Sequence, residues 1–117
     1  MKKSATILVL LILSSCILFA QDDNFITGNY DKAEYQVEMR DGVKLYTIVY
    51  TPKNKSQDYP ILMQRTPYSI RPYGTRMRTQ LSHNKWLQED LYIFVFQDVR
   101  GKFMSEGEFV DMRPVKT

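Results

Sequence analysis

The stretch LYIFVFQDVRG, residues 91–101, decides the fold class of this 117-residue chain. Residues 91–96 are apolar without a break, which is the pattern of a strand covered on both faces. Polar residues follow it directly, at the place where an α/β sheet carries its functional loops. Asp98 and Arg100 are spaced to pair with each other or with loop backbone, and Gly101 allows a tight turn. The stretch therefore predicts a buried strand with a charged, sharply turning loop at its carboxyl end.

The segment upstream of this strand predicts further strands and a helix. Residues 35–40 alternate apolar and polar side chains, and Asp41-Gly42 is a favoured two-residue hairpin turn because both positions can take positive φ. The remaining elements are expected to be a return strand, a third strand and a helix with one apolar side, over residues 43–50, 59–65 and about 75–90. The order β-β-β-α-β predicts the first part of an α/β sheet whose later strands run parallel.

Composition and charge limit the class of protein. Apolar residues make up 44% and charged residues 25%, the balance of a globular chain with room for one small domain. The formal net charge is +3 and no basic stripe appears, so a nucleic-acid partner is not expected. A single histidine and scattered carboxylates do not make a ligand set, so neither a metal nor a cofactor is predicted.

The first 20 residues have the layout of a secretory signal peptide. Two lysines precede an apolar stretch, residues 5–20, which is shorter than the about 20 residues that span a bilayer. Two endings remain open: cleavage after Ala20, or acylation of Cys16, because LSSC resembles a bacterial lipoprotein box. Both endings predict export to the periplasm or the extracellular space, with a membrane anchor only if Cys16 is lipidated.

The mature chain is expected to have no disulfide. Cys16 is the only cysteine of the 117-residue sequence and lies within the predicted signal. The domain must therefore depend on its hydrophobic core. Residues 21–34 are polar and predicted to be irregular, and residues 35–117 are predicted to form the domain.

Two motifs resemble those of a known family. RTPY, residues 65–68, follows the third predicted strand, and FQDVRGKFMSEGEFVDMRP, residues 96–114, includes the end of the next. Together they resemble the X-Pro dipeptidyl-peptidase, cocaine-esterase and α-amino-acid ester hydrolase family of serine hydrolases, from about Glu34 to Pro114. The resemblance implies the N-terminal portion of an α/β-hydrolase fold. The residues that carry the motifs, apart from the tyrosine, are Arg65, Pro67, Asp98, Arg100, Gly101, Ser105 and Gly107.

The resemblance implies an oxyanion-hole role for Tyr68. In that family the tyrosine of this motif places its hydroxyl beside a backbone N–H of the residue after the nucleophilic serine. A phenol at the end of a rigid strand suits this task, and Pro67 fixes the backbone ahead of it. The alternative is that Tyr68 packs against the helix, and Tyr73 is expected to be a packing or surface residue.

The nucleophile is not predicted within this chain. No G-x-S-x-G elbow occurs, and Ser105 lacks the glycine that would stand two residues before a nucleophile. His83 is expected to be a surface or partly packed residue, so no general base can be assigned. The serine, acid and histidine of a triad would therefore lie outside this chain.

We expect an N-terminal fragment of an exported serine hydrolase, inactive alone, from a truncated, split or decayed gene. In the complete enzyme its partner would be a small-molecule ester or amide, or a peptide. The alternative is a small exported binding or structural protein without catalysis, which would use the tyrosines, arginines and prolines of residues 65–74 as a contact surface.

Overall fold

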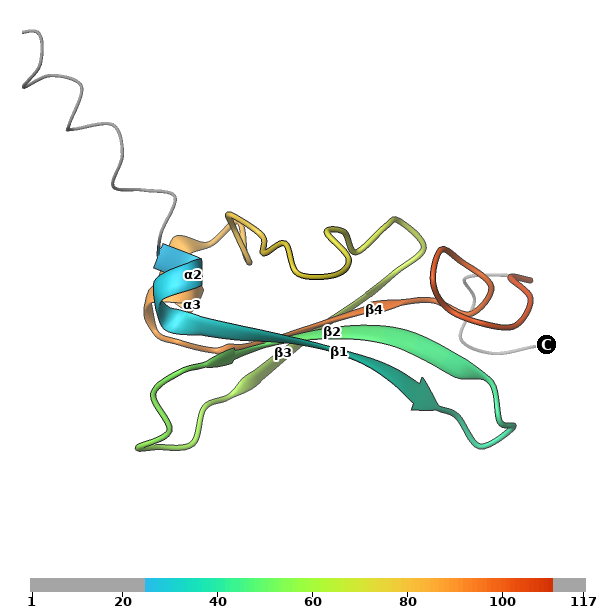
Figure 1. Cartoon of the computed structure of the whole chain (residues 1–117), viewed down its shortest axis with the longest axis horizontal. Coiled ribbons are helices and arrows are strands. Elements are labelled where there is room, and N and C mark those ends of the chain that lie inside the picture. Colours follow the sequence, from blue (N-terminus) through green and yellow to red (C-terminus); the bar gives the residue numbers. More distant parts are fainter. Residues whose placement is uncertain (1–24, 111–117) are drawn as a thin grey trace, which may run out of the picture.

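The computed structural model of the protein describes residues 25–110, which fold around one four-stranded sheet (Figure 1). Its elements in chain order are α2 (Phe25–Asn29), β1 (Tyr30–Glu38), β2 (Lys44–Pro52), β3 (Ile61–Thr66), α3 (Lys85–Glu89) and β4 (Ile93–Asp98). The strands lie in the order β1-β2-β4-β3. The first two pairs are antiparallel, and β3 is parallel to β4. The predicted α/β class, with a parallel pair after the hairpin, is confirmed.

The hairpin between β1 and β2 closes through a loop one residue longer than predicted. The N–H of Met39 donates to the carbonyl of Val43 over 2.8 Å, so residues 40–42 form a three-residue loop. Gly42 takes the positive φ expected of it, +81°, which is the left-handed position that such loops place last.

The hydrophobic core lies on one face of the sheet. Figure 1 shows α2, α3 and the segment between β3 and α3 on the same side of the strands. Their contact with the sheet buries Ile26, Tyr30, Ile48, Tyr50, Ile70, Leu81, Phe94 and Phe96. The expectation that β4 is covered on both faces holds for one face only, because Ile93 and Val95 on the other face are only partly buried.

The helix predicted from about 75 to 90 is mostly wrong, since only Lys85–Glu89 is helical. Side chains occupy the backbone groups that a longer helix would need. The side-chain oxygen of Gln88 accepts the N–H groups of Leu81 and Ser82, and Asn84 caps the helix by accepting from Trp86. Such local side-chain bonds compete with helix formation, so the helix begins only after Asn84.

The sheet also begins earlier in the chain than predicted, at Tyr30 instead of Tyr35. Within residues 21–34, expected to be irregular, the described part forms α2 and the first half of β1. All nine residues of β1 pair with β2, so the partner strand decides where β1 begins. The predicted signal segment, residues 1–20 with Cys16, lies outside the described residues. Among residues 25–110, no helix is long and apolar enough to cross a membrane.

The edge strand β3 presents apolar side chains to solvent. β3 pairs with β4 along one of its two hydrogen-bonding edges, and no described strand pairs with its other edge. Ile61 is 65% exposed and Met63 53% exposed, and no proline interrupts the strand. An open apolar edge is a site for pairing with another chain. β1, the other edge, carries charged side chains that oppose such pairing.

We expect the purified 117-residue chain to self-associate through β3. Met63→Lys should shift it toward monomer, because a charge on an edge strand blocks pairing with a second copy. Light scattering after size exclusion, over a range of concentrations, measures the effect. Val37→Lys on β1 is the matched control and should leave association unchanged. A wild-type monomer that melts cooperatively above about 60 °C would contradict the prediction.

Candidate functional site

The candidate site lies at the carboxyl edge of the sheet, which is the end at which the parallel strands β3 and β4 both stop. Thr66 is paired with Asp98, and the N–H of Val99 donates to the carbonyl of Thr66 over 3.2 Å. The RTPY loop and the loop after β4 therefore leave the sheet side by side. This is the edge at which α/β sheets bind ligands.

Tyr68 extends from this edge into solvent. Its backbone N–H donates to Thr66 Oγ1 over 3.1 Å, directly after β3. Its side chain is 78% exposed, so it does not pack against α3. The hydroxyl donates to no residue of the described part of the chain. Pro67 precedes it and restricts the backbone there.

Asp98 joins the two loops. It is fully buried, and its carboxylate accepts three hydrogen bonds. The N–H of Ile70 donates to Oδ1 over 3.3 Å, and the Tyr73 hydroxyl donates to Oδ2 over 2.8 Å. The N–H of Met104 donates to Oδ2 over 3.4 Å. Asp98 thus bonds loop backbone, one of the two roles predicted for it.

Arg100 does not pair with Asp98. Its guanidinium binds Asp41 in the hairpin turn, with a shortest N···O distance of 2.7 Å. The hydrogen bond from Arg100 holds the pKa of Asp41 below its usual value. Both side chains are substantially exposed, so this pair contributes little to stability. It ties the loop after β4 to the hairpin.

The remaining motif residues have structural contacts. Ser105 Oγ donates to the carbonyl of Asp98 over 2.7 Å and accepts the N–H of Tyr46 over 2.8 Å. A Cβ at Gly101 would lie 2.1 Å from the backbone nitrogen of Phe109, so no other residue fits there. Ser105 is buried, and its hydroxyl bridges the end of β4 to β2.

Arg65 and Gly107 also hold neighbouring segments together. Arg65 Nε donates to the side-chain oxygen of Gln97 over 2.7 Å, which links β3 to β4. A Cβ at Gly107 would lie 2.8 Å from the Arg100 side chain, so glycine lets the loop pack closely. These contacts shape the edge without presenting a reactive group.

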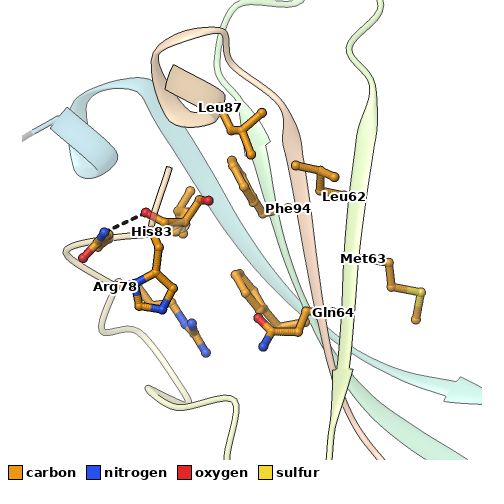
Figure 2. Close-up of a pocket in the computed structure, with 11 residues that line it drawn as sticks. Leu62, Met63, Gln64, Arg78, His83, Leu87 and Phe94 are labelled. Atoms are coloured by element: carbon orange, nitrogen blue, oxygen red, sulfur yellow. Dashed lines mark hydrogen bonds between the residues drawn. The ribbon is translucent and has the colours of Figure 1, made fainter. Parts of the chain in front are cut away.

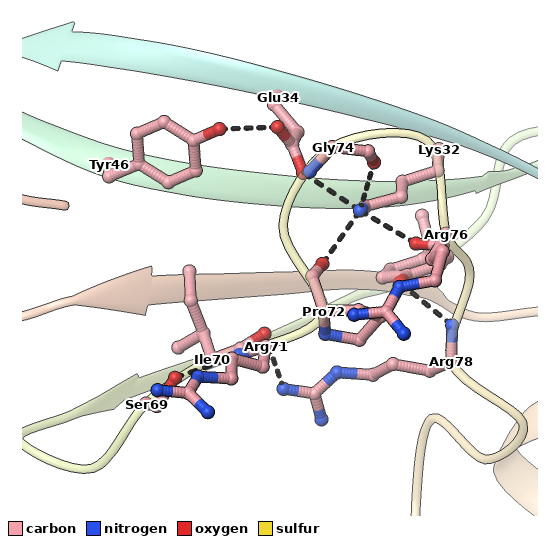
Figure 3. Close-up of polar contacts among 11 residues, drawn as sticks. Lys32, Glu34, Tyr46, Ser69, Ile70, Arg71, Pro72, Gly74, Arg76 and Arg78 are labelled. Atoms are coloured by element: carbon pink, nitrogen blue, oxygen red, sulfur yellow. Dashed lines mark hydrogen bonds and ion pairs between the residues drawn. The ribbon is translucent and has the colours of Figure 1, made fainter. Parts of the chain in front are cut away.

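Lys32 and Glu34 of β1 form a polar clamp (Figure 3). The clamp holds residues 72–76, which continue the loop that begins with RTPY. Lys32 Nζ donates to the carbonyls of Pro72, Gly74 and Arg76 over 2.7, 2.6 and 2.9 Å. It also lies 2.8 Å from the Glu34 carboxylate, which accepts the N–H of Gly74 over 2.8 Å. The clamp satisfies backbone groups of a segment that has no regular structure.

Tyrosine hydroxyls connect the clamp to Asp98. Tyr46 donates to Glu34, and its ring meets that of Tyr73 edge-on at 5.5 Å between centroids. Burial and the carboxylate of Asp98 raise the pKa of Tyr73, which keeps its hydroxyl protonated as a donor. Tyr73 is a packing residue, as predicted.

Sequence reasoning missed Lys32 and Glu34, because residues 21–34 were expected to be irregular. Opposite charges two residues apart lie on one face of a strand, which was the available signal once β1 was recognised.

A groove of about 480 Å³ lies over β3 and β4, and neither Tyr68 nor Asp98 lines it (Figure 2). Its walls include Leu62, Phe94 and Arg78, with His83 at its rim. His83 is exposed, as expected, and Tyr68 does not line the groove. Within residues 25–110, no three histidine, cysteine or acidic side chains gather as a metal site would require.

The strand order and the loops at the carboxyl edge define the N-terminal portion of an α/β hydrolase sheet. Residues 41–117 match the family model described as X-Pro dipeptidyl-peptidase (S15 family). The chain belongs to this family, so the resemblance inferred from the two motifs is confirmed.

Three relatives extend this assignment. Cocaine esterase of Rhodococcus sp. (strain MB1 Bresler) is 41% identical over 88 residues, 73% of this chain and 15% of that protein. The structure of a selenomethionine-labelled α-amino acid ester hydrolase is 40% identical with a TM-score of 0.63, over 74% of this chain and 15% of its own. An aminopeptidase from a marine sediment archaeon, Thaumarchaeota archaeon, is 37% identical with a TM-score of 0.63, over 81% and 16%. The chain thus spans about 15% of the length of these relatives.

The clamp makes stability sensitive to acid. Burial opposes ionisation of Glu34, but hydrogen bonds from Lys32, Tyr46 and Gly74 outweigh it and hold its pKa below the usual value. A lowered folded-state pKa stabilises the fold above about pH 4.3, the ordinary value for glutamate, and this contribution is lost as pH falls. Glu34→Gln should therefore flatten the loss of stability between neutral pH and about pH 3.

Urea unfolding of the 117-residue chain across this pH range measures the effect of Glu34→Gln. Glu38→Gln is the matched control, because Glu38 is exposed at the end of the same strand. Its acid profile should equal that of the wild type. Parallel profiles for wild type and Glu34→Gln would show that the clamp does not depend on the charge.

Proposed function

We propose that Tyr68 supplies an oxyanion-hole donor to an S15-family serine hydrolase that cleaves esters or amides, peptides included. The observation that carries this proposal is the position of Tyr68: its hydroxyl bonds no residue within 25–110, and its loop is anchored at the carboxyl end of a parallel strand pair. Oxyanion donors act by being aimed in advance at the oxygen that gains charge. The loop after the third strand is where α/β hydrolases place part of that hole.

The chemical step needs little of Tyr68 beyond one hydrogen bond. A serine hydroxyl attacks the carbonyl carbon of the substrate and loses its proton to a histidine. The carbonyl oxygen then bears the negative charge, and the phenol of Tyr68 donates to it while keeping its own proton. The charge disappears when the carbonyl re-forms and the leaving group departs with the proton that the histidine took from the serine.

The other catalytic groups would come from polypeptide beyond this chain. The sequence has no G-x-S-x-G, and His83, between β3 and α3, lines the groove that Tyr68 does not reach. We therefore expect the 117-residue chain alone to turn over neither p-nitrophenyl acetate nor an X-Pro-nitroanilide. Turnover that a serine-directed fluorophosphonate abolishes would reveal a nucleophile within the chain.

The test of Tyr68 is a chimera in which residues 25–110 replace the matching segment of Rhodococcus cocaine esterase. Tyr68→Phe keeps the ring and removes only the donor. Its kcat should fall by about 100- to 1,000-fold. KM should change little, because the ground-state carbonyl carries less charge than the transition state. Steady-state kinetics with p-nitrophenyl acetate measures both.

Tyr35→Phe is the matched control for this test. Tyr35 is also exposed, at 53%, and lies on β1, the strand farthest from β3 in the sheet. Its removal should leave kcat within about threefold of the parent chimera. An unchanged kcat for Tyr68→Phe would favour the alternative, in which the exposed tyrosine is a contact residue of a protein interface.

We propose in addition that the protein is exported. This rests on the lysines and the apolar stretch within residues 1–20, which have the layout of a signal peptide. Mass spectrometry of the secreted or envelope-bound protein should find an N-terminus at Gln21, or an acylated Cys16. The cytoplasmic control fraction should contain little of the processed form. An intact Met1 on a soluble cytoplasmic protein would contradict export.

A further inference from the structure

Phe103, in the loop after β4, has a backbone conformation that is unfavourable for its residue type. Its φ is +49°, in the left-handed region that bulky residues rarely adopt. Its ring is 52% exposed, so burial does not offset the strain. Leu91 provides the contrast: its φ is +60°, but it directly follows Asp90, the C-cap of α3, and packs against the core. Only the strain at Leu91 is explained by folding.

Backbone hydrogen bonds on both sides of Phe103 restrain its conformation. Immediately around it, the N–H of Lys102 donates to the carbonyl of Val99 over 3.1 Å, and the N–H of Ser105 donates to that of Lys102 over 3.0 Å. Gly101 and Glu106 close the loop with a further bond of 2.9 Å. Backbone strain that the surroundings impose in this way is characteristic of functional sites.

The strained residue belongs to the same edge as Tyr68. Met104, the next residue, donates its N–H to Asp98 Oδ2, and Ile70 of the Tyr68 loop donates to Oδ1. Met104 is 48% exposed. One carboxylate therefore anchors both the loop with the exposed phenol and the loop with two exposed apolar side chains. Figure 1 shows the loop after β4 at the end of the sheet where β3 also terminates.

We propose that Phe103 and Met104 form an apolar wall that contacts the substrate beside Tyr68 and sets its specificity. This inference rests on the proposed function. The favoured substrates carry an aromatic or other bulky apolar group next to the scissile ester or amide bond. Substrate sites combine apolar walls with a few placed polar groups, and the carboxyl edge has both. The loop holds the ring in the open, where a substrate can cover it.

The test compares esters that differ only in this apolar group. In the chimera with cocaine esterase, kcat/KM is measured for p-nitrophenyl acetate and benzoate, and for ethyl and phenyl acetate. Phe103→Gly should lower the preference for the aromatic member of at least one pair by about tenfold. Trp86→Ala is the control. It removes an exposed aromatic side chain from α3, which lies before the start of β4, whereas Phe103 follows the end of β4.

A second host separates this inference from the role of Tyr68. Residues 99–109 alone are transplanted into cocaine esterase, which keeps its own catalytic groups, and Phe103→Gly is repeated there. A lower aromatic preference in this host supports the wall even if Tyr68→Phe has no effect in the chimera. Unchanged preferences in this host would overturn the wall and leave the test of Tyr68 intact.

Stability distinguishes a substrate contact from a packing role. Glycine adopts a φ of +49° without strain, and this relief offsets the extra backbone entropy of glycine in the unfolded chain, so Phe103→Gly should unfold at about the same urea concentration as wild type. A midpoint clearly below wild type for the 117-residue chain would show that the ring serves folding, and would overturn the proposal.

Discussion

The carboxylate of Asp98 is the contact on which the carboxyl edge of the sheet depends. A carboxylate removed from water is costly unless hydrogen bonds replace its hydration. Here the replacement comes from two loop N–H groups and one phenol, which belong to segments on either side of β4 in the sequence. Because one buried side chain serves both loops, neither loop can leave without exposing or orphaning the charge. The edge therefore behaves as one unit.

A second anchor acts on the opposite kind of backbone group. Asp98 accepts from N–H groups, whereas Lys32 donates to three carbonyls further along the same segment. A segment without helix or strand must still find hydrogen-bond partners for its backbone N–H and carbonyl groups. The side chains of Asp98 and Lys32 are such partners. The ring of Tyr68 takes part in neither anchor. It can face solvent because its loop is held at other points.

Membership of the S15 family and the function of the edge are separate conclusions. The family follows from the match over residues 41–117 and from relatives near 40% identity. A shared fold does not itself assign chemistry, so the proposed role of Tyr68 rests on where its hydroxyl lies and on what restrains its loop. The strained backbone at Phe103 is independent of that role, since it concerns a different loop and a different property.

The sequence by itself determined the features that depend on neighbours along the chain. The apolar run before Asp98 predicted β4, the alternation around Asp41-Gly42 predicted the hairpin, and two short motifs predicted the family. Only the tertiary structure decided the rest. Lys32 reaches carbonyls some 40 residues away, and Arg100 pairs with Asp41, 59 residues away, instead of its neighbour Asp98. The predicted helix shortened because side chains took the hydrogen bonds that its backbone needed. Local pattern predicts which backbone can form an element, but partners distant in sequence decide whether its polar groups are bonded there or elsewhere.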